Sequence, residues 1–152
     1  MIRKKFCLLL VASLCAACGG TDPEPIEIPL THVTFNELGF VEAGSYLFRN
    51  RAEWEAFWLA HPHPGYPSRQ VPVVDFGNAA VAGIFAGPKG RCNRLDITSA
   101  STFKGTVTLR YRISTFGAGT PSSCLGNDQF TLNLADVVLV PKETSAVKSE
   151  AE

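Results

Sequence analysis

A strict alternation of apolar and polar residues over residues 106–115 is the feature that most constrains the fold of this chain. Val107, Leu109, Tyr111 and Ile113 are separated by single polar residues. Successive side chains of a β-strand point to opposite faces, so the pattern predicts a strand with one buried and one solvated face. Such strands are typical of antiparallel sheets, because parallel sheets covered by helices need apolar residues at nearly every position.

The rest of the chain adds several more strand-like segments and one helix. Apolar segments with strand character lie at residues 30–38, 44–48, 79–85, 94–100, 129–135 and 137–140. Asn50 followed by Glu53 has the spacing of a helix N-cap with a reciprocal acid, and predicts a helix over residues 51–60. We therefore expect an α+β fold, mostly β, with one or two antiparallel sheets of about six to seven strands and one amphipathic helix packed on them.

The predicted helix carries an aromatic stripe. Trp54, Phe57 and Trp58 follow one another at spacings of three and four residues, which places them on one face. An aromatic face of this kind either anchors the helix to a sheet or binds a ligand or partner. We expect the first role, in which all three residues are core residues.

Residues 1–18 have the order of a bacterial lipoprotein signal. Basic residues precede an apolar run of 12 residues, from Phe6 to Ala17, and Cys18 follows the small residues Ala16 and Ala17. A helix of that length spans about 18 Å, which is too short for a hydrocarbon core of about 30 Å. We expect cleavage after residue 17 and attachment of palmitate-type acyl chains to Cys18. The alternative is ordinary cleavage before an unmodified Cys18.

The remaining chain divides into three parts by composition. Residues 18–29 are rich in glycine, proline and acids, which predicts a flexible tether, residues 30–142 form the predicted domain, and residues 143–152 are a predicted disordered tail. Gly19 follows the lipidated cysteine, where an Asp is typical of retention at the inner membrane. We therefore expect a lipid-anchored envelope protein, at the outer membrane in a cell that has one.

Cysteine and charge counts narrow the function further. Of the five cysteines, Cys7 and Cys15 leave with the signal and Cys18 carries the lipid, so Cys92 and Cys124 remain as a pair that we expect to form a disulfide outside the inner membrane. The alternative is a reactive thiol.

The net charge bears on the kind of partner. Of the 14 basic residues, three leave with the signal, so the mature chain has 11 basic and 14 acidic residues and a net charge near −3. This balance, without any basic run, argues against nucleic acid as a partner.

The sequence offers few groups for chemistry, and we expect no catalytic residue and no cofactor. His61 and His63 could bind a metal, but the intervening proline and the lack of nearby ligands favour a solvent-exposed turn. Asp75 follows an apolar pair, which is typical of a carboxylate that caps a turn, although catalysis is the alternative. Residues 87–90 contain glycines without phosphate-loop spacing and predict a turn between strands.

Four short stretches in succession carry a family resemblance. R-A-E-W-E-A-F-W at 51–58, V-V-D-F at 73–76, V-A-G-I-F-A-G at 81–87 and V-V-L-V-P-K at 137–142 resemble the PrcB family of protease-complex-associated lipoproteins. The similarity covers residues 33–142. It implies a non-catalytic accessory protein that associates with or stabilises a secreted protease, and it carries no active-site residues.

Two further functions remain open besides this one. The first is a binder that acts as a protease inhibitor. The second is a hydrolytic or metal-dependent enzyme that uses His61, His63 and Asp75. A cleft where these side chains converge would favour the enzyme, whereas an apolar patch or an open strand edge would favour a binding role.

Overall fold

The computed structural model describes residues 23–35, 38–62, 70–90, 92–115 and 131–152. Within these ranges the chain forms seven strands and one helix, which confirms the expected α+β, mostly β, class. The elements are β1 (Ile26–Ile28), β2 (Gly44–Phe48), α1 (Arg51–Ala60), β3 (Ala79–Gly90), β4 (Asn93–Phe103), β5 (Thr106–Thr115), β6 (Thr131–Pro141) and β7 (Ala146–Ala151).

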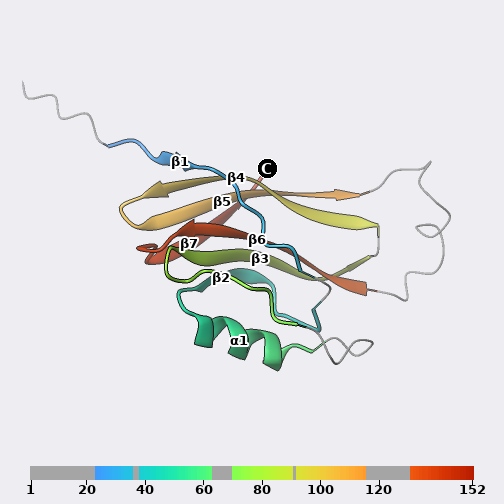
Figure 1. Cartoon of the computed structure of the whole chain (residues 1–152). Helices are drawn as coiled ribbons and strands as arrows, with labels where there is room; N and C mark the ends of the chain where they lie inside the picture. Colours follow the sequence, from blue (N-terminus) through green and yellow to red (C-terminus); the bar gives the residue numbers. More distant parts are fainter. Residues whose placement is uncertain (1–22, 36–37, 63–69, 91, 116–130) are drawn as a thin grey trace, which may run out of the picture.

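The strands form two sheets that pack face to face (Figure 1). The outer sheet has the order β1-β4-β5-β7, and the central sheet has the order β2-β3-β6. All neighbouring strands are antiparallel except β5 and β7, which run parallel. Helix α1 covers the face of the central sheet that points away from the outer sheet, so the domain has three layers.

Strand β3 shows why the central sheet is buried on both faces. Ala80, Ala82 and Ile84 belong to the core between the two sheets, whereas Val81 and Phe85 belong to the core beneath α1. Both sets of side chains are buried. A strand covered on two faces needs apolar residues at consecutive positions, which accounts for the unbroken apolar run in this segment.

Helix α1 has the boundaries and the role expected from its sequence. The Asn50 side chain accepts a hydrogen bond from the Glu53 amide at 2.9 Å, which satisfies one free donor of the first turn. Trp54 is 1% exposed, Trp58 is also buried, and Phe57 is half-buried against them. Trp54 also donates from Nε1 to the Pro72 carbonyl at 2.9 Å. The aromatic stripe is therefore part of the core beneath the helix.

Strands β4 and β5 form a hairpin with a two-residue turn. Lys104 and Gly105 both have positive φ, 49° and 77°, as a type I′ turn requires. Val107 and Leu109 of β5 are fully buried, as the alternation predicts, while Ile113 near the end of the strand is 40% exposed. The buried face of β5 thus fades towards its C-terminal end.

Both predicted domain boundaries are wrong. β1 lies within the predicted tether of residues 18–29, where its short I-E-I pattern pairs with β4. β7 lies within the predicted disordered tail of residues 143–152, where it pairs with β5 and places Val147 against the core. Edge strands carry many exposed polar residues, so their composition resembles that of disordered chain. The folded domain extends at least from Ile26 to Ala151.

Three predicted strand boundaries also differ from the structure. Of the predicted strand at residues 30–38, the described residues 30–35 and 38 do not form a strand, and His32 makes an isolated bridge to Val138. The described part of the predicted segment 129–135, which begins at residue 131, and the predicted segment 137–140 belong to one strand, β6, which passes through Asp136. The predicted turn at residues 87–90 lies inside β3, where a β-bulge after Phe85 gives Gly87 a φ of 69°.

Candidate functional site

The N-terminal segment crosses one long side of the sandwich from the outer to the central sheet (Figure 1). β1 first pairs with β4, with Ile28 opposite Ala100. A few residues later the Leu139 amide of β6 donates to the Thr31 carbonyl at 2.9 Å, and the Val33 amide donates to the Val137 carbonyl at 2.8 Å. Among the described residues, this segment therefore covers one half of this side and leaves the other half uncovered.

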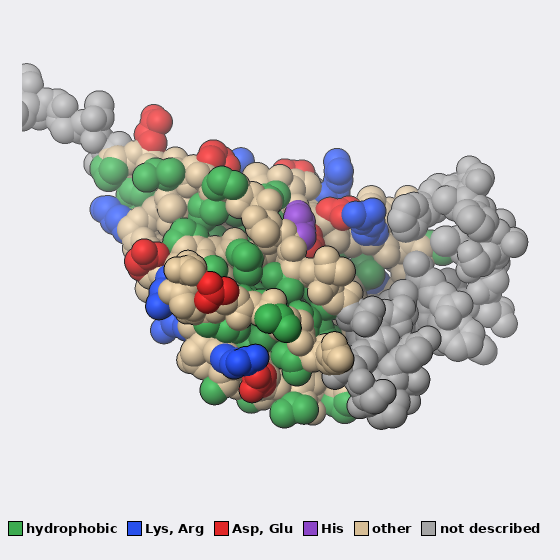
Figure 2. All heavy atoms as spheres, viewed as in Figure 1, with side chains coloured by type: hydrophobic (Ala, Val, Ile, Leu, Met, Phe, Trp, Pro, Cys, Tyr) green, Lys and Arg blue, Asp and Glu red, His purple; other side chains and the backbone are tan. Residues whose placement is uncertain are grey.

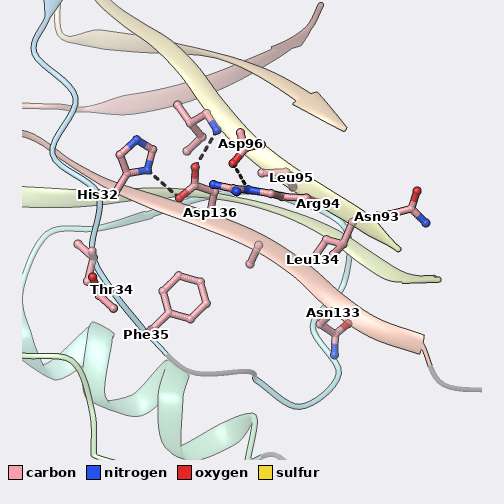
Figure 3. Close-up of a pocket in the computed structure, with 13 residues that line it drawn as sticks. His32, Thr34, Phe35, Asn93, Arg94, Leu95, Asp96, Asn133, Leu134 and Asp136 are labelled. Atoms are coloured by element: carbon pink, nitrogen blue, oxygen red, sulfur yellow. Dashed lines mark hydrogen bonds and ion pairs between the residues drawn. The ribbon is translucent and has the colours of Figure 1, made fainter. Parts of the chain in front are cut away.

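The uncovered half forms a groove of about 600 Å³ between the two sheets (Figure 3). Its walls are the N-terminal half of β4, the N-terminal half of β6 and the segment around Phe35. The lining residues are His32, Val33, Thr34, Phe35, Asn93, Arg94, Leu95, Asp96, Ile97, Asn133, Leu134, Ala135 and Asp136. Figure 2 shows a histidine beside acidic and basic side chains on the face that these views present.

Asp136 links the walls of the groove. Its Oδ2 accepts a hydrogen bond from the Ile97 amide of β4 at 2.7 Å, and its Oδ1 accepts one from the Val137 amide at 2.8 Å. The same Oδ1 lies 2.9 Å from Nδ1 of His32 (Figure 3). The Asp136 side chain is only 14% exposed, whereas that of His32 is 47% exposed. A carboxylate thus occupies the place where the carbonyl of a neighbouring strand would accept from β4.

The groove also carries an ion pair and an unsatisfied amide oxygen. Arg94 Nε lies 2.5 Å from Asp96 Oδ1 on β4. Asn133 donates from Nδ2 to the Gly39 carbonyl, and its buried Oδ1 has no hydrogen-bond partner among the described residues. A buried acceptor without a donor costs about 1 to 3 kcal/mol, and such atoms are rare in folded proteins.

The predicted turn cap at Asp75 is confirmed. Its Oδ1 accepts from the Gly77 amide at 2.9 Å and its Oδ2 accepts from Asn78 Nδ2 at 2.7 Å, while its carbonyl accepts the Asn78 and Ala79 amides. These bonds close the turn that leads into β3. The carboxylate oxygens are engaged in local structure rather than directed at another predicted site residue.

The predicted histidine pair is described only in part. His61 follows the C-terminal end of α1, where its Nδ1 lies 2.7 Å from the Phe57 carbonyl and its ring packs on the Phe57 ring at 4.6 Å. His63 lies outside the described residues. In the described ranges no three His, Cys, Asp or Glu side chains come together as a metal site would require.

The predicted lipidation and disulfide sites are also only partly covered. The signal segment, Cys18 and Cys124 lie outside the described residues. Cys92 directly precedes β4 and is the sequence neighbour of Asn93 at the end of the groove. Its pairing with Cys124 remains a prediction. Across the ranges that the structure describes, no helix has the length and hydropathy needed to cross a membrane.

The residues that shape the groove were missed by sequence analysis. Asp136 lies between the two predicted strand segments 129–135 and 137–140, and the sequence pattern assigns it no role. The signal that it offered was an acid in a strand that is otherwise buried, because such an acid needs hydrogen-bond donors nearby. The sequence does not indicate that these donors come from β4 and from His32.

Comparison with known proteins adds no relative to this picture: no protein family, no curated protein and no solved structure matches the chain.

Proposed function

We propose that the protein is a non-catalytic, lipid-anchored accessory module of the cell envelope that binds another envelope protein. The observation that carries the proposal is the groove, because two sheets present strand edges to it at the same place. Exposed strand edges are a common means of protein–protein recognition. The resemblance to the PrcB family suggests that the partner belongs to a secreted protease complex.

The contacts of the polar residues support a binding role over a catalytic one. Asp136 is engaged by the Ile97 and Val137 amides, and Arg94 is paired with Asp96. His61 and Asp75 make local contacts at the end of α1 and in the turn before β3, respectively. A catalytic site needs a nucleophile, base or acid positioned against a substrate, and these groups instead hold elements of the fold together.

The position of β1 bears on how the groove would be presented at a membrane. With acyl chains on Cys18, seven residues would separate the anchor from Ile26, the first residue of β1. A fully extended chain of that length spans about 25 Å. The β1 end of the domain would therefore stay close to the lipid surface, whereas the groove would lie further along β4, away from the end that carries the tether.

The anchor is tested by replacing Cys18 with Ser in the native host. We expect the wild-type protein to incorporate labelled palmitate and to sediment with membranes, and the C18S variant to lose the label and leave the membrane fraction. A single acyl chain gives only marginal attachment, so stable sedimentation with membranes depends on the several acyl chains that lipoproteins carry on this cysteine. The C18S variant can carry none of them. Absence of label on the wild type would refute the anchor.

The binding role is tested by photo-crosslinking in the native host. A photoreactive residue at Thr34 lies in the groove, and one at Leu59, which is 76% exposed on α1, is the control. We expect an envelope protein to be trapped from position 34 and not from position 59, and to decrease in abundance when this gene is deleted. An increase in the activity of a trapped protease upon deletion would instead indicate an inhibitor, and no trapped protein from either position would contradict the proposal.

A further inference from the structure

We infer that the groove binds an extended polypeptide segment, which adds as a strand to β4 at residues 93–97 and directs a Lys or Arg side chain at Asp136. This inference rests on the proposed function and specifies the mode of binding. It follows from the hydrogen-bond directions of β4, from the way β1 already uses the same edge, and from the charges in the groove.

The first step concerns the direction of the β4 backbone groups. Ile97 lies opposite Tyr111 of β5, yet its amide donates to Asp136 on the other side of β4. The Tyr111 carbonyl likewise points away from β4 and accepts from the Glu152 amide. Backbone groups alternate in direction along an antiparallel strand, so those of Leu95 and Asn93 also point away from β5. They point towards the groove that these residues line.

The second step is the example that the chain itself provides. β1 pairs with the same outer edge of β4, at residues 100–102, in an antiparallel register. It occupies that edge with three residues, two of which are isoleucines. The N-terminal half of β4 presents the same kind of edge over five residues, about 17 Å, with no strand beside it among the described residues. This edge can therefore accept a second extended segment in line with β1.

The third step is the charge of the groove. The Arg94 guanidinium is already paired with Asp96, which leaves the Asp136 carboxylate as the remaining full charge, with His32 beside it. Each carboxylate oxygen can accept two hydrogen bonds, and Oδ2 of Asp136 receives one, from Ile97. A Lys or Arg of the added strand would supply the second donor, and a Glu at that position would face an acid.

The test uses amide hydrogen exchange by NMR and two synthetic peptides. Both have nine residues of alternating valine and threonine, with a central Lys in one and a central Glu in the other. In the protein alone we expect Leu95 and Asn93 to exchange faster than Arg94 and Asp96, whose amides point to β5. The Lys peptide should slow exchange of Leu95, and the Glu peptide should bind about tenfold more weakly, because an attractive pair is replaced by a repulsive one.

Matched variants show whether the effect belongs to the groove. Thr34 is exposed and lines the groove, whereas Thr31 is exposed in the same segment outside it. Thr34→Trp should abolish peptide binding, and Thr31→Trp should leave it unchanged. Asp136→Asn should remove the preference for Lys, while Glu150→Gln on β7, far along the outer sheet, should not.

The possible results distinguish failure of this inference from failure of the proposed function. Peptide binding without protection of Leu95, or equal binding of both peptides, would refute the strand mode or its charge preference. Protection of Leu95 that rises with protein concentration, together with a dimer in sedimentation, would make a second copy the occupant. If the T34W variant still co-purifies with the envelope partner that the wild-type protein binds, binding occurs elsewhere and only this inference fails. If peptides bind but no envelope protein is trapped, the strand site stands and the proposed function fails.

Discussion

The two halves of the outer edge of β4 differ in what covers them. At residues 100–102 the edge is covered by β1 and its backbone groups face a neighbouring strand. At residues 93–97 the one hydrogen bond that this edge receives from the described residues comes from the Asp136 carboxylate, which reaches the Ile97 amide from β6. The strand, the sheet and the core beneath are the same in both halves. The difference arises where the N-terminal segment leaves the outer sheet to pair with β6.

This comparison separates two ways of satisfying a strand edge. A strand such as β1 forms backbone hydrogen bonds with several amides and carbonyls of the edge at once, so no single bond can be exchanged for one to a partner. A side chain such as that of Asp136 satisfies one amide and leaves its neighbours accessible. The first closes an edge, and the second joins the edge to the opposite sheet at one amide and leaves the neighbouring amides available to a partner.

The largest expected effect comes from destabilising the central sheet, on which the outer sheet with both halves of the β4 edge packs. Trp54→Ala or Trp58→Ala removes a buried ring from the core beneath α1, and should lower the free energy of unfolding by about 3 to 5 kcal/mol. Domains of this size are stable by only about 5 to 15 kcal/mol, so melting temperatures should fall markedly. Thermal unfolding measures this. Leu59→Ala on the exposed face of the same helix is the control, and an unchanged melting curve for the tryptophan variants would mean that the stripe serves a partner instead.

A slightly smaller effect is expected from replacing Cys92, which precedes residues 93–97 of β4, the open half of the edge. If Cys92 and Cys124 form a disulfide, Cys92→Ser should lower stability by about 3 to 4 kcal/mol through loss of loop closure. It should also speed amide exchange at Asn93 more than at Ala100, because only the open half begins beside Cys92. Peptide mass mapping without reductant checks the bond itself, which needs Cα atoms within about 7 Å. Recovery of both residues as free thiols from protein made in the periplasm would refute it.

Removing the single cap of the open half should cost less. Asp136→Ala leaves the Ile97 amide without its acceptor, which we expect to destabilise the domain by about 1 to 3 kcal/mol. Chemical denaturation gives the stability, and hydrogen exchange should show faster exchange at Ile97 with little change at Ala100. Asp96→Ala removes a carboxylate of the exposed ion pair and should change stability by less than about 1 kcal/mol. Equal effects of the two variants would mean that Asp136 does not hold the edge.

The smallest expected effect comes from opening the covered half. Ile28→Pro prevents β1 from pairing with Ala100 and should lower stability by about 1 to 2 kcal/mol. Its informative result is the exchange rate of the Ala100 amide, which should rise towards that of Leu95. Pro29 is already in place next to this residue, and Pro29→Ala serves as the control. If Ala100 stays protected in I28P, β1 is not what closes this half.

The elements with local signals could be predicted from the sequence and those with distant partners could not. α1 has a capping residue and an aromatic stripe, and β5 has a clean alternation, so their observed bounds match the predicted ones. β1 and β7 have neither signal, because both are short edge strands whose pairing depends on β4 and β5 far along the chain. The groove was missed for the same reason, since Asp136 meets Ile97 across 39 positions of sequence.

The short turn at Lys104 and Gly105 has a consequence for how the molecule folds. In the described chain, β4 and β5 are the only hydrogen-bonded neighbours joined by so short a connection, whereas every other pair must first close a long loop. Loop closure slows folding, so this hairpin should form first and the complete domain on the slower, millisecond-to-second scale of proteins with distant pairings. Until β1 arrives, the whole edge of β4 is exposed to any neighbouring chain. A molecule that is still folding should therefore be most prone to aggregate through the outer edge of β4, which β1 covers only at residues 100–102 in the folded domain.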